Sequence, residues 1–277
     1  MRRARQPGRA VQQPVSHDGK TFGEPTKVGD HVVFSSFPTA TNPNAPIIRE
    51  PRCNFGRGRE ECIPGAFIRT NDFPRIAVDK GNGDLFATWQ DYRTGSFDIQ
   101  LSMSRDGGQT WQSAAKGVNP DTTRDHYMPA IDIGSNHQVA VSYYRTERVP
   151  NENNPPLHPT GCFTTPGVAG TCFLPGDPGV QAEPSNYFLA GGRGLATPFR
   201  DVRLSPSFDA PDGNQIGFNG DYSGLAVSGN EAHPIWSDTR NSVTVISPSQ
   251  GVVHDEDVFT DRVAVPNANG GDDDHQD

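Results

Sequence analysis

Acidic residues and a tyrosine stand just before several short apolar runs of this sequence. They are Asp72, Asp125, Asp221 and Tyr222. Carboxylates that lie close together raise one another's pKa, so one of them can serve as a proton donor. Tyr222 lies beside Asp221 in a segment with flanking glycines. These four residues are the candidate catalytic set.

Arginines and one further tyrosine border the same runs and could bind an anionic ligand. A guanidinium group matches a carboxylate with two parallel hydrogen bonds, so converging arginines would recognise an acidic sugar. The candidate substrate-binding residues are Arg75, Arg93, Arg145, Arg240 and Tyr127.

Each candidate also has a structural interpretation. The three aspartates could be turn formers that bond the backbone two residues on. His126 is expected to be a surface or hydrogen-bonded histidine rather than a catalyst. Two Asp-x-Arg pairs could bond internally or cap turns, namely Asp91 with Arg93 and Asp238 with Arg240.

Short strands must position these residues, and the segment 73–111 shows how. Arg75–Val78, Leu85–Trp89 and Phe97–Met103 are apolar or alternating runs bounded by turn residues, which predicts antiparallel strands joined by tight turns. The segment 89–93 recurs at 236–240 and more loosely at 141–145, and each copy follows a further strand-like run. Asp98, Asp201 and Asp257 are each expected to open a third strand. We therefore predict four-stranded antiparallel sheets near residues 73–118, 126–218 and 221–265, and no long helix. Trp89 and Trp236 are expected in the core.

The turn at 104–111 carries a family resemblance. Ser104, Asp106, Gly108 and Trp111 fit the pattern S-x-D-x-G-x-x-W and resemble the Asp box, or BNR repeat, of the sialidase (neuraminidase) superfamily. The segment 16–22 is similar but one residue shorter, with Phe22 in the tryptophan position. The resemblance implies an all-β fold, a β-propeller of four-stranded blades. This chain would supply about three to three and a half blades, and six blades close such a ring.

The same resemblance implies hydrolysis of a glycan of the exo-α-sialidase type. Enzymes of that family hold the sugar carboxylate with three arginines, attack with a tyrosine helped by a glutamate, and protonate the leaving group with an aspartate. The family's R-I-P motif is matched only loosely around Arg75, and no motif identifies the tyrosine and glutamate pair. The alternative is a non-catalytic propeller that binds a glycan or a protein. A sialoside or other glycan is the expected partner, together with further blades from a longer chain or a second copy.

The repeats divide the chain into segments. We expect a disordered leader (1–15), the end of a blade (16–37), a Cys-bearing loop (38–72), one blade (73–118), a second blade (119–218) with an insertion at 146–184, a third blade (219–265), and an acidic disordered tail (266–277). Since candidate site residues precede first strands or follow second strands, they should lie on the face opposite Asp106.

Composition excludes some partners. The net charge of −9 argues against nucleic acid and anionic membrane surfaces. No stretch approaches the 18 apolar residues of a membrane span, and no cofactor is expected.

The 4 cysteines form two close pairs in loop-rich stretches, which predicts local disulfides and an extracellular or periplasmic location. The expected pairs are Cys53 with Cys62 and Cys162 with Cys172, although the sequence leaves all three connectivities open. A zinc site is the rival interpretation, but neither pair has C-x-x-C spacing, so we expect no metal. The basic N-terminus lacks the apolar region of a signal peptide.

Overall fold

The computed structural model describes the chain in several ranges. These are residues 9–32 except 17, 52–53, 60–61, 63, 68–69, 73–147 except 95, 184–209, 218–244, 252–254 and 256–267. Every regular element in these ranges is a β-strand, which confirms the predicted all-β fold. No helix in the described residues is long and apolar enough to cross a membrane.

The first four-stranded sheet is an antiparallel meander in chain order. Its strands are β5 (Arg75–Val78), β6 (Leu85–Asp91), β7 (Asp98–Ser104) and β8 (Gln112–Ser113). Arg75 lies opposite Thr88 and Val78 opposite Leu85, which is the predicted strand pairing.

The middle sheet follows the same order after the sequence insertion. It consists of β9 (His126–Ile133), β10 (Val139–Thr146), β11 (Ser185–Gly192) and β12 (Arg200–Arg203). The expectation that Asp201 opens a third strand was wrong, because Asp201 lies inside β12 and pairs with Ala190 of β11. The third strand starts at Ser185, where an apolar run resumes.

The third sheet contains β13 (Gly224–Ser228), β14 (Glu231–Asp238) and β17 (Asp257–Thr260), and β18 (Val263–Ala264) pairs with the start of β14. Three two-stranded sheets complete the described chain. They are β1 (Arg9–Gln13) with β2 (Thr26–His31), β3 (Arg52–Cys53) with β4 (Glu60–Glu61), and β15 (Ser242–Thr244) with β16 (Val252–His254).

The structure tests the predicted leader at 1–15 but not the predicted disulfides. The segment 1–15 is not entirely a disordered leader, because β1 pairs with β2. The expected disulfides lie outside the described residues, since the side chain of Cys53 and all of Cys62, Cys162 and Cys172 belong to that part of the chain.

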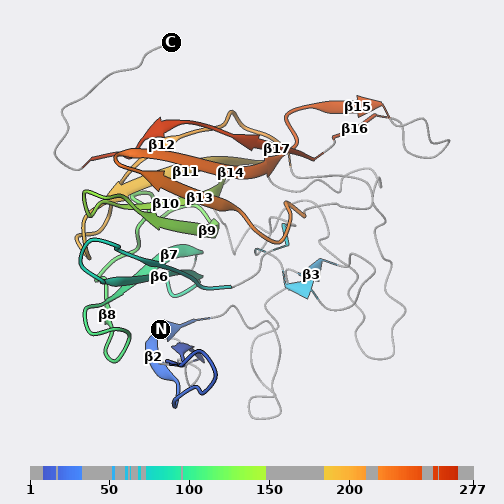
Figure 1. Cartoon of the computed structure of the whole chain (residues 1–277). Helices are drawn as coiled ribbons and strands as arrows, with labels where there is room; N and C mark the ends of the chain where they lie inside the picture. Colours follow the sequence, from blue (N-terminus) through green and yellow to red (C-terminus); the bar gives the residue numbers. More distant parts are fainter. Residues whose placement is uncertain are drawn as a thin grey trace, which may run out of the picture.

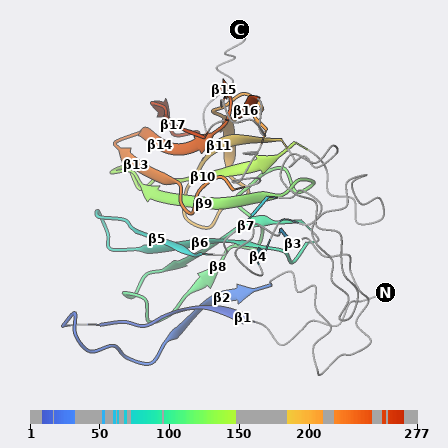
Figure 2. The same cartoon turned by 90° about the vertical axis from the view of Figure 1, so that its right-hand side faces the viewer.

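The sheets follow one another face to face, from β1 and β2 through β5–β8 and β9–β12 to the sheet of β13, β14 and β17 (Figures 1 and 2). Strand β9 contacts β5 on one side and β13 on the other. This succession of antiparallel sheets around their first strands is that of a partial β-propeller. The middle sheet is covered on both faces, so almost every residue of β9, β10 and β11 is buried.

Two apolar layers hold the three larger sheets together. Phe86 and Leu101 pack with Ile131 and Val141 between the first and middle sheets. Between the middle and third sheets the layer is aromatic, since Tyr144 packs with Tyr127 and Tyr187, and Tyr187 stacks on Trp236 with ring centroids 4.8 Å apart. Trp89 and Trp236 are buried, as predicted.

The turn between β7 and β8 is held by one carboxylate. Asp106 accepts hydrogen bonds from the Ser104 hydroxyl (2.8 Å), the Thr110 amide (2.8 Å) and the Thr110 hydroxyl (2.5 Å). These bonds lower the pKa of Asp106 to about 2. Gly107 and Gly108 adopt positive φ angles of 70° and 90°, which glycine tolerates without steric strain.

We predict that Trp236→Ala destabilises the protein by about 3–5 kcal/mol, because it removes a large buried ring from the aromatic layer. Denaturant unfolding measures this change. The control is Tyr222→Ala, whose side chain is 66% exposed and should change stability by less than about 0.5 kcal/mol. Equal effects of the two variants would contradict the assigned core.

Candidate functional site

The predicted site residues that the structure describes lie at one end of the sheets, which we call the upper end. Asp91 pairs with Asp98 where β6 meets β7, and Leu85 pairs with Ser104 at the opposite end. Asp106 follows Ser104, so its turn lies at the lower end. The starts of β9 and β13 share the upper end, since the His126 amide bonds to the Phe97 carbonyl and the Ser223 hydroxyl bonds to the Met128 carbonyl.

An exposed aromatic cluster lies at the upper end, where β5 and β13 begin. The rings of Phe73 and Tyr222 stack with centroids 6.1 Å apart, and the Arg75 guanidinium lies 4.8 Å from the centroid of Tyr222. Beside them, Arg69 lies 4.6 Å from the Phe218 ring centroid and 3.6 Å from a carboxylate oxygen of Asp221. Phe73 is 49% and Tyr222 66% exposed, so the aromatic cluster offers apolar surface to solvent. We call these six residues the aromatic cluster.

Arg93 forms part of a clasp between the first sheet and the β1–β2 pair. Its Nε and Nη2 donate to the two carboxylate oxygens of Asp91 at 2.7 and 2.9 Å, and its Nη2 also donates to the Asp30 carbonyl at 2.8 Å. The Val32 amide donates to Asp91 at 2.7 Å. The hydrogen bond with Asp91 raises the pKa of Arg93, even though burial opposes this. The pair therefore joins two sheets.

Arg240 repeats this arrangement in the third sheet. Its Nε lies 2.9 and 3.0 Å from the two carboxylate oxygens of Asp238, and its guanidinium carbon lies 3.9 Å from the Phe259 ring centroid. The Trp236 indole donates to the same carboxylate at 3.0 Å. The neighbouring Thr239 hydroxyl bonds to the Asp209 carbonyl, which follows the middle sheet. The structural interpretation of both Asp-x-Arg pairs therefore holds, although the two arginines remain partly exposed.

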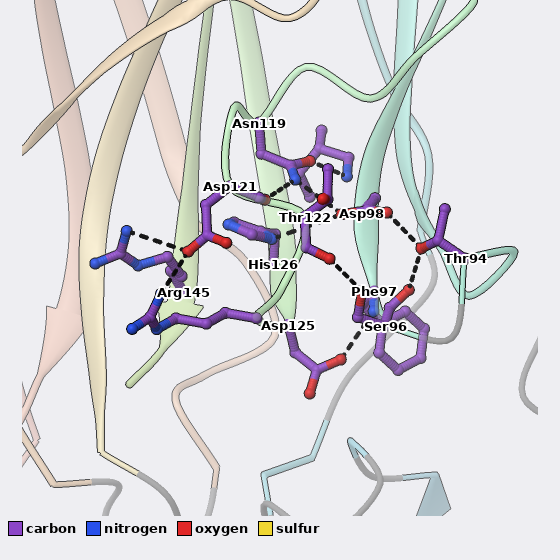
Figure 3. A network of polar contacts seen from close by, with 12 residues as sticks. Thr94, Ser96, Phe97, Asp98, Asn119, Asp121, Thr122, Asp125, His126 and Arg145 are labelled. Atoms are coloured by element: carbon purple, nitrogen blue, oxygen red, sulfur yellow. Dashed lines mark hydrogen bonds and ion pairs between the residues drawn. The ribbon is translucent and has the colours of Figure 1, made fainter. Parts of the chain in front are cut away.

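A polar network fills the upper end of the contact between the first and middle sheets (Figure 3). Asp98 accepts hydrogen bonds from the Thr94 hydroxyl (2.5 Å) and the Asn119 amide (2.8 Å). The two hydrogen bonds lower the pKa of Asp98, but burial has the larger effect and raises it. Asp125 accepts from the Phe97 amide at 2.8 Å and is 2% exposed, so its carboxylate connects the sheets.

Two arginines share the Asp121 carboxylate at the edge of this network (Figure 3). Arg124 lies 2.8 Å and Arg145 3.7 Å from the same oxygen. Burial raises the pKa of Asp121, but hydrogen bonds from Thr123 and Arg124 outweigh it and lower that pKa to about 2. Arg145 also lies 4.1 Å from the centroid of the Phe188 ring. The guanidinium of Arg145 therefore lies between the Phe188 ring and a carboxylate that it shares with Arg124.

His126 is not a surface histidine. Its side chain is fully buried, and within the described part of the chain neither ring nitrogen has a hydrogen-bond partner of good geometry. The nearest carboxylate oxygen, on Asp98, lies 3.9 Å from Nδ1. Burial lowers the pKa of His126 to about 4, so the imidazole is neutral at pH 7.

The structure thus brings only some of the predicted site residues together. The catalytic candidate Asp125 is not among them, because it is buried between the first and middle sheets. Asp221, Tyr222 and Arg75 meet in the aromatic cluster, whereas Arg93, Arg145 and Arg240 engage their own carboxylates elsewhere. Tyr127 belongs to the core, where its hydroxyl bonds to Ser185 and Asn219, and Asp72 lies outside the described residues. Sequence reasoning did not select Phe73, Arg69 or Phe218. The sequence signal for the two phenylalanines is an aromatic residue next to a proline or a glycine in the segment that leads into a first strand, whereas Arg69 has no such signal. Within the described residues no group of His, Cys, Asp and Glu is arranged to hold a metal ion.

Comparisons with known proteins give weak structural likenesses. No family model matches the chain, and no curated protein matches it in sequence. A Penicillium chrysogenum α-L-arabinanase has a TM-score of 0.37 at 15% identity, with 61% of this chain and 41% of the arabinanase covered. The endosialidase of phage phi92 has a TM-score of 0.38 at 14% identity, with 73% of this chain and 28% of the endosialidase covered. The microbial sialidase Hz136 has a TM-score of 0.32 at 12% identity, with 69% of this chain and 44% of the sialidase covered. The chain spans less than half of each of these proteins, which are propeller glycoside hydrolases.

The burial of His126 predicts a loss of stability in acid. The unfolded histidine takes up its proton near pH 6.5, but the folded one only near pH 4. Unfolding therefore binds a proton in this interval, and the free energy of unfolding falls as the pH falls from about 6.5 to about 4. His126→Phe should flatten this dependence in denaturant titrations.

Asp98 acts in the opposite direction, because its raised pKa lets the folded state bind a proton more readily than the unfolded state. Asp98→Asn should therefore steepen the acid loss. The prediction for His126 is wrong if His126→Phe and the unmodified protein lose the same stability between these pH values.

Proposed function

We propose that this protein is a carbohydrate-binding β-propeller module whose ligand rests on the aromatic cluster. The exposed, stacked pair of Phe73 and Tyr222 carries the proposal. Aromatic rings offer broad apolar faces at small entropic cost, and such faces pack against the C–H faces of sugar rings. The pair sits at the upper end, where two first strands converge, on a rigid sheet scaffold.

The charges around the aromatic pair favour an acidic sugar. Arg69 and Arg75 bring two positive charges and Asp221 one negative charge. Arg75 contacts the ring of Tyr222 and forms no ion pair with any described residue, so its fork is available for a ligand carboxylate. A sialoside or uronic acid end of a glycan is therefore the proposed ligand class.

The engaged arginines favour binding over sialidase-type hydrolysis. A sialidase needs three arginines converging on one carboxylate, but Arg93 and Arg240 are bonded to Asp91 and Asp238. Arg145 is paired with Asp121. Extracting Arg93 or Arg240 would leave the buried carboxylate of Asp91 or Asp238 without its cation, which costs several kcal/mol.

The second candidate function is that of a glycoside hydrolase, and the observation that favours it is the position of Tyr222. Its side chain is exposed beside Asp221, where a phenol could act as nucleophile towards a bound sugar, and the resemblance of the 104–111 turn to the Asp box points to the same chemistry.

We expect Tyr222→Ala to weaken glycan binding at least tenfold, about 1.4 kcal/mol, because the stacking surface is lost. A glycan array with the full chain selects the ligand, and calorimetry measures the dissociation constant. The matched control is Phe22→Ala, which removes an aromatic ring that is 65% exposed in the β1–β2 turn. Absence of any glycan binding, or equal weakening by both variants, would contradict the proposal.

Hydrolysis is separated from binding by a fluorogenic sialoside. A binding module gives no turnover above background at any pH between 4 and 8, whereas a hydrolase gives turnover that Tyr222→Phe abolishes. Arg240→Ala is the informative third variant. Because Arg240 pairs with the buried carboxylate of Asp238, we expect this substitution to lower the melting temperature without changing the affinity for the anionic glycan.

A further inference from the structure

The segment 219–223 carries two residues of the aromatic cluster and is anchored at its first residue. The side-chain amide of Asn219 donates to the Tyr127 hydroxyl at 3.0 Å, and the Asn219 carbonyl accepts from the Ser237 hydroxyl at 2.8 Å. Asn219 is 1% exposed, so the start of the segment is fixed in the protein interior.

Ser223 anchors the other end of this segment. Its hydroxyl donates to the Met128 carbonyl of β9 at 2.9 Å. Strand β13 begins at the next residue, Gly224. The residue that directly follows the exposed Tyr222 therefore connects it to the middle sheet.

The carbonyl that Ser223 binds belongs to a β-bulge in β9. Two residues, Met128 and Pro129, face the single residue Tyr143 of β10, and the register shifts there. Met128 has a positive φ of 51°, which is unfavourable for a residue with a side chain. Its amide donates to the Gln90 side chain of the first sheet at 2.8 Å, while its carbonyl accepts from Ser223. The strained residue therefore bonds both to the first sheet and to the entry of the third.

The direction of the Met128 carbonyl bears on the aromatic cluster. Bulges redirect backbone groups, and strained residues persist only where neighbouring bonds fix them. Tyr222 is 66% exposed, so contacts with the rest of the protein restrict its ring little. A backbone fixed at the adjacent residue leaves the ring fewer arrangements, and a pre-organised surface binds its ligand at a smaller entropic cost.

We propose that Ser223 is a positioning residue, which holds the Tyr222 ring stacked on Phe73 by fixing the adjacent backbone to the Met128 carbonyl. The inference rests on the proposed function, because it names the residue that prepares the aromatic cluster for an acidic sugar. Ser223 acts through Tyr222 and not through a ligand contact of its own.

The test compares Ser223→Ala with Ser223→Thr, which keeps a hydroxyl group. The rings of Phe73 and Tyr222 have centroids 6.1 Å apart, so nuclear Overhauser effects (NOEs) between them report the stacking in the full chain without a ligand. Titrations with methyl α-N-acetylneuraminide and methyl β-glucuronide, the two acidic-sugar probes, give dissociation constants. We expect Ser223→Ala to weaken the ring NOEs about threefold and the affinity about fivefold, and Ser223→Thr to retain both.

The matched control is Ser96→Ala. The Ser96 hydroxyl also donates to a backbone carbonyl, that of Thr122, at 3.3 Å, and Thr122 lies in the segment between β8 and β9. We expect this variant to change the melting temperature by a similar amount, because it also removes one hydroxyl-to-carbonyl bond. It should change neither the ring NOEs nor the affinity.

The positioning role and the proposed function fail in different ways. If neither sugar binds but Ser223→Ala still weakens the ring NOEs, the proposed acidic-sugar ligand is wrong and the positioning role stands. The positioning role is overturned if Ser223→Ala lowers the melting temperature and leaves the ring NOEs unchanged, whether or not a sugar binds. It is also overturned if a sugar binds to Ser223→Ala as tightly as to the unmodified protein, or if Ser96→Ala weakens the ring NOEs equally.

Discussion

The aromatic layer between the middle and third sheets is the contact on which the rest of the structure depends. Four large rings, those of Tyr127, Tyr144, Tyr187 and Trp236, are buried there within stacking or edge distance. Each tyrosine hydroxyl finds a partner, as when Tyr187 bonds to Ser142 and Tyr144 to the Ser237 carbonyl. Burying such rings is favourable only when their polar ends are satisfied. The layer therefore fixes both the spacing and the register of the two sheets.

The placement of the sheets relative to one another decides which residues can contact a ligand. Once β5, β9 and β13 stand side by side, residues that enter these strands converge at the upper end. Residues that leave the second strands lie further out, over the contacts between sheets. Asp91 and Asp238 are fully buried there, and a buried carboxylate requires a paired cation. Arg93 and Arg240 supply that charge, so the arginines whose positions suggested ligand binding instead pair with buried carboxylates.

Much of the fold could be predicted from the sequence, because alternation and turn residues are local signals. The meander of β5 and β6 and the burial of Trp89 follow from such signals alone. The start of β11 could not be predicted, because the long insertion breaks the repeat and Asp201 offered a false match. The prediction of disorder for residues 1–15 was wrong for β1. That strand forms by pairing with β2, and composition does not reveal such a contact.

The site was harder to predict for a physical reason. Residue type and spacing identify which side chains can bind an anion, but they do not show which charges are already neutralised. The sequence motif Asp-x-Arg is the same whether the guanidinium faces a ligand or its own carboxylate. The aromatic cluster is less ambiguous, because Phe73 and Tyr222 remain 49% and 66% exposed although they stack on each other. Tyr222 was selected for its possible reactivity, yet its 66% exposure and its stacking on Phe73 make it first a surface for recognition. Any chemistry at Tyr222 would act on a ligand that this surface had already bound.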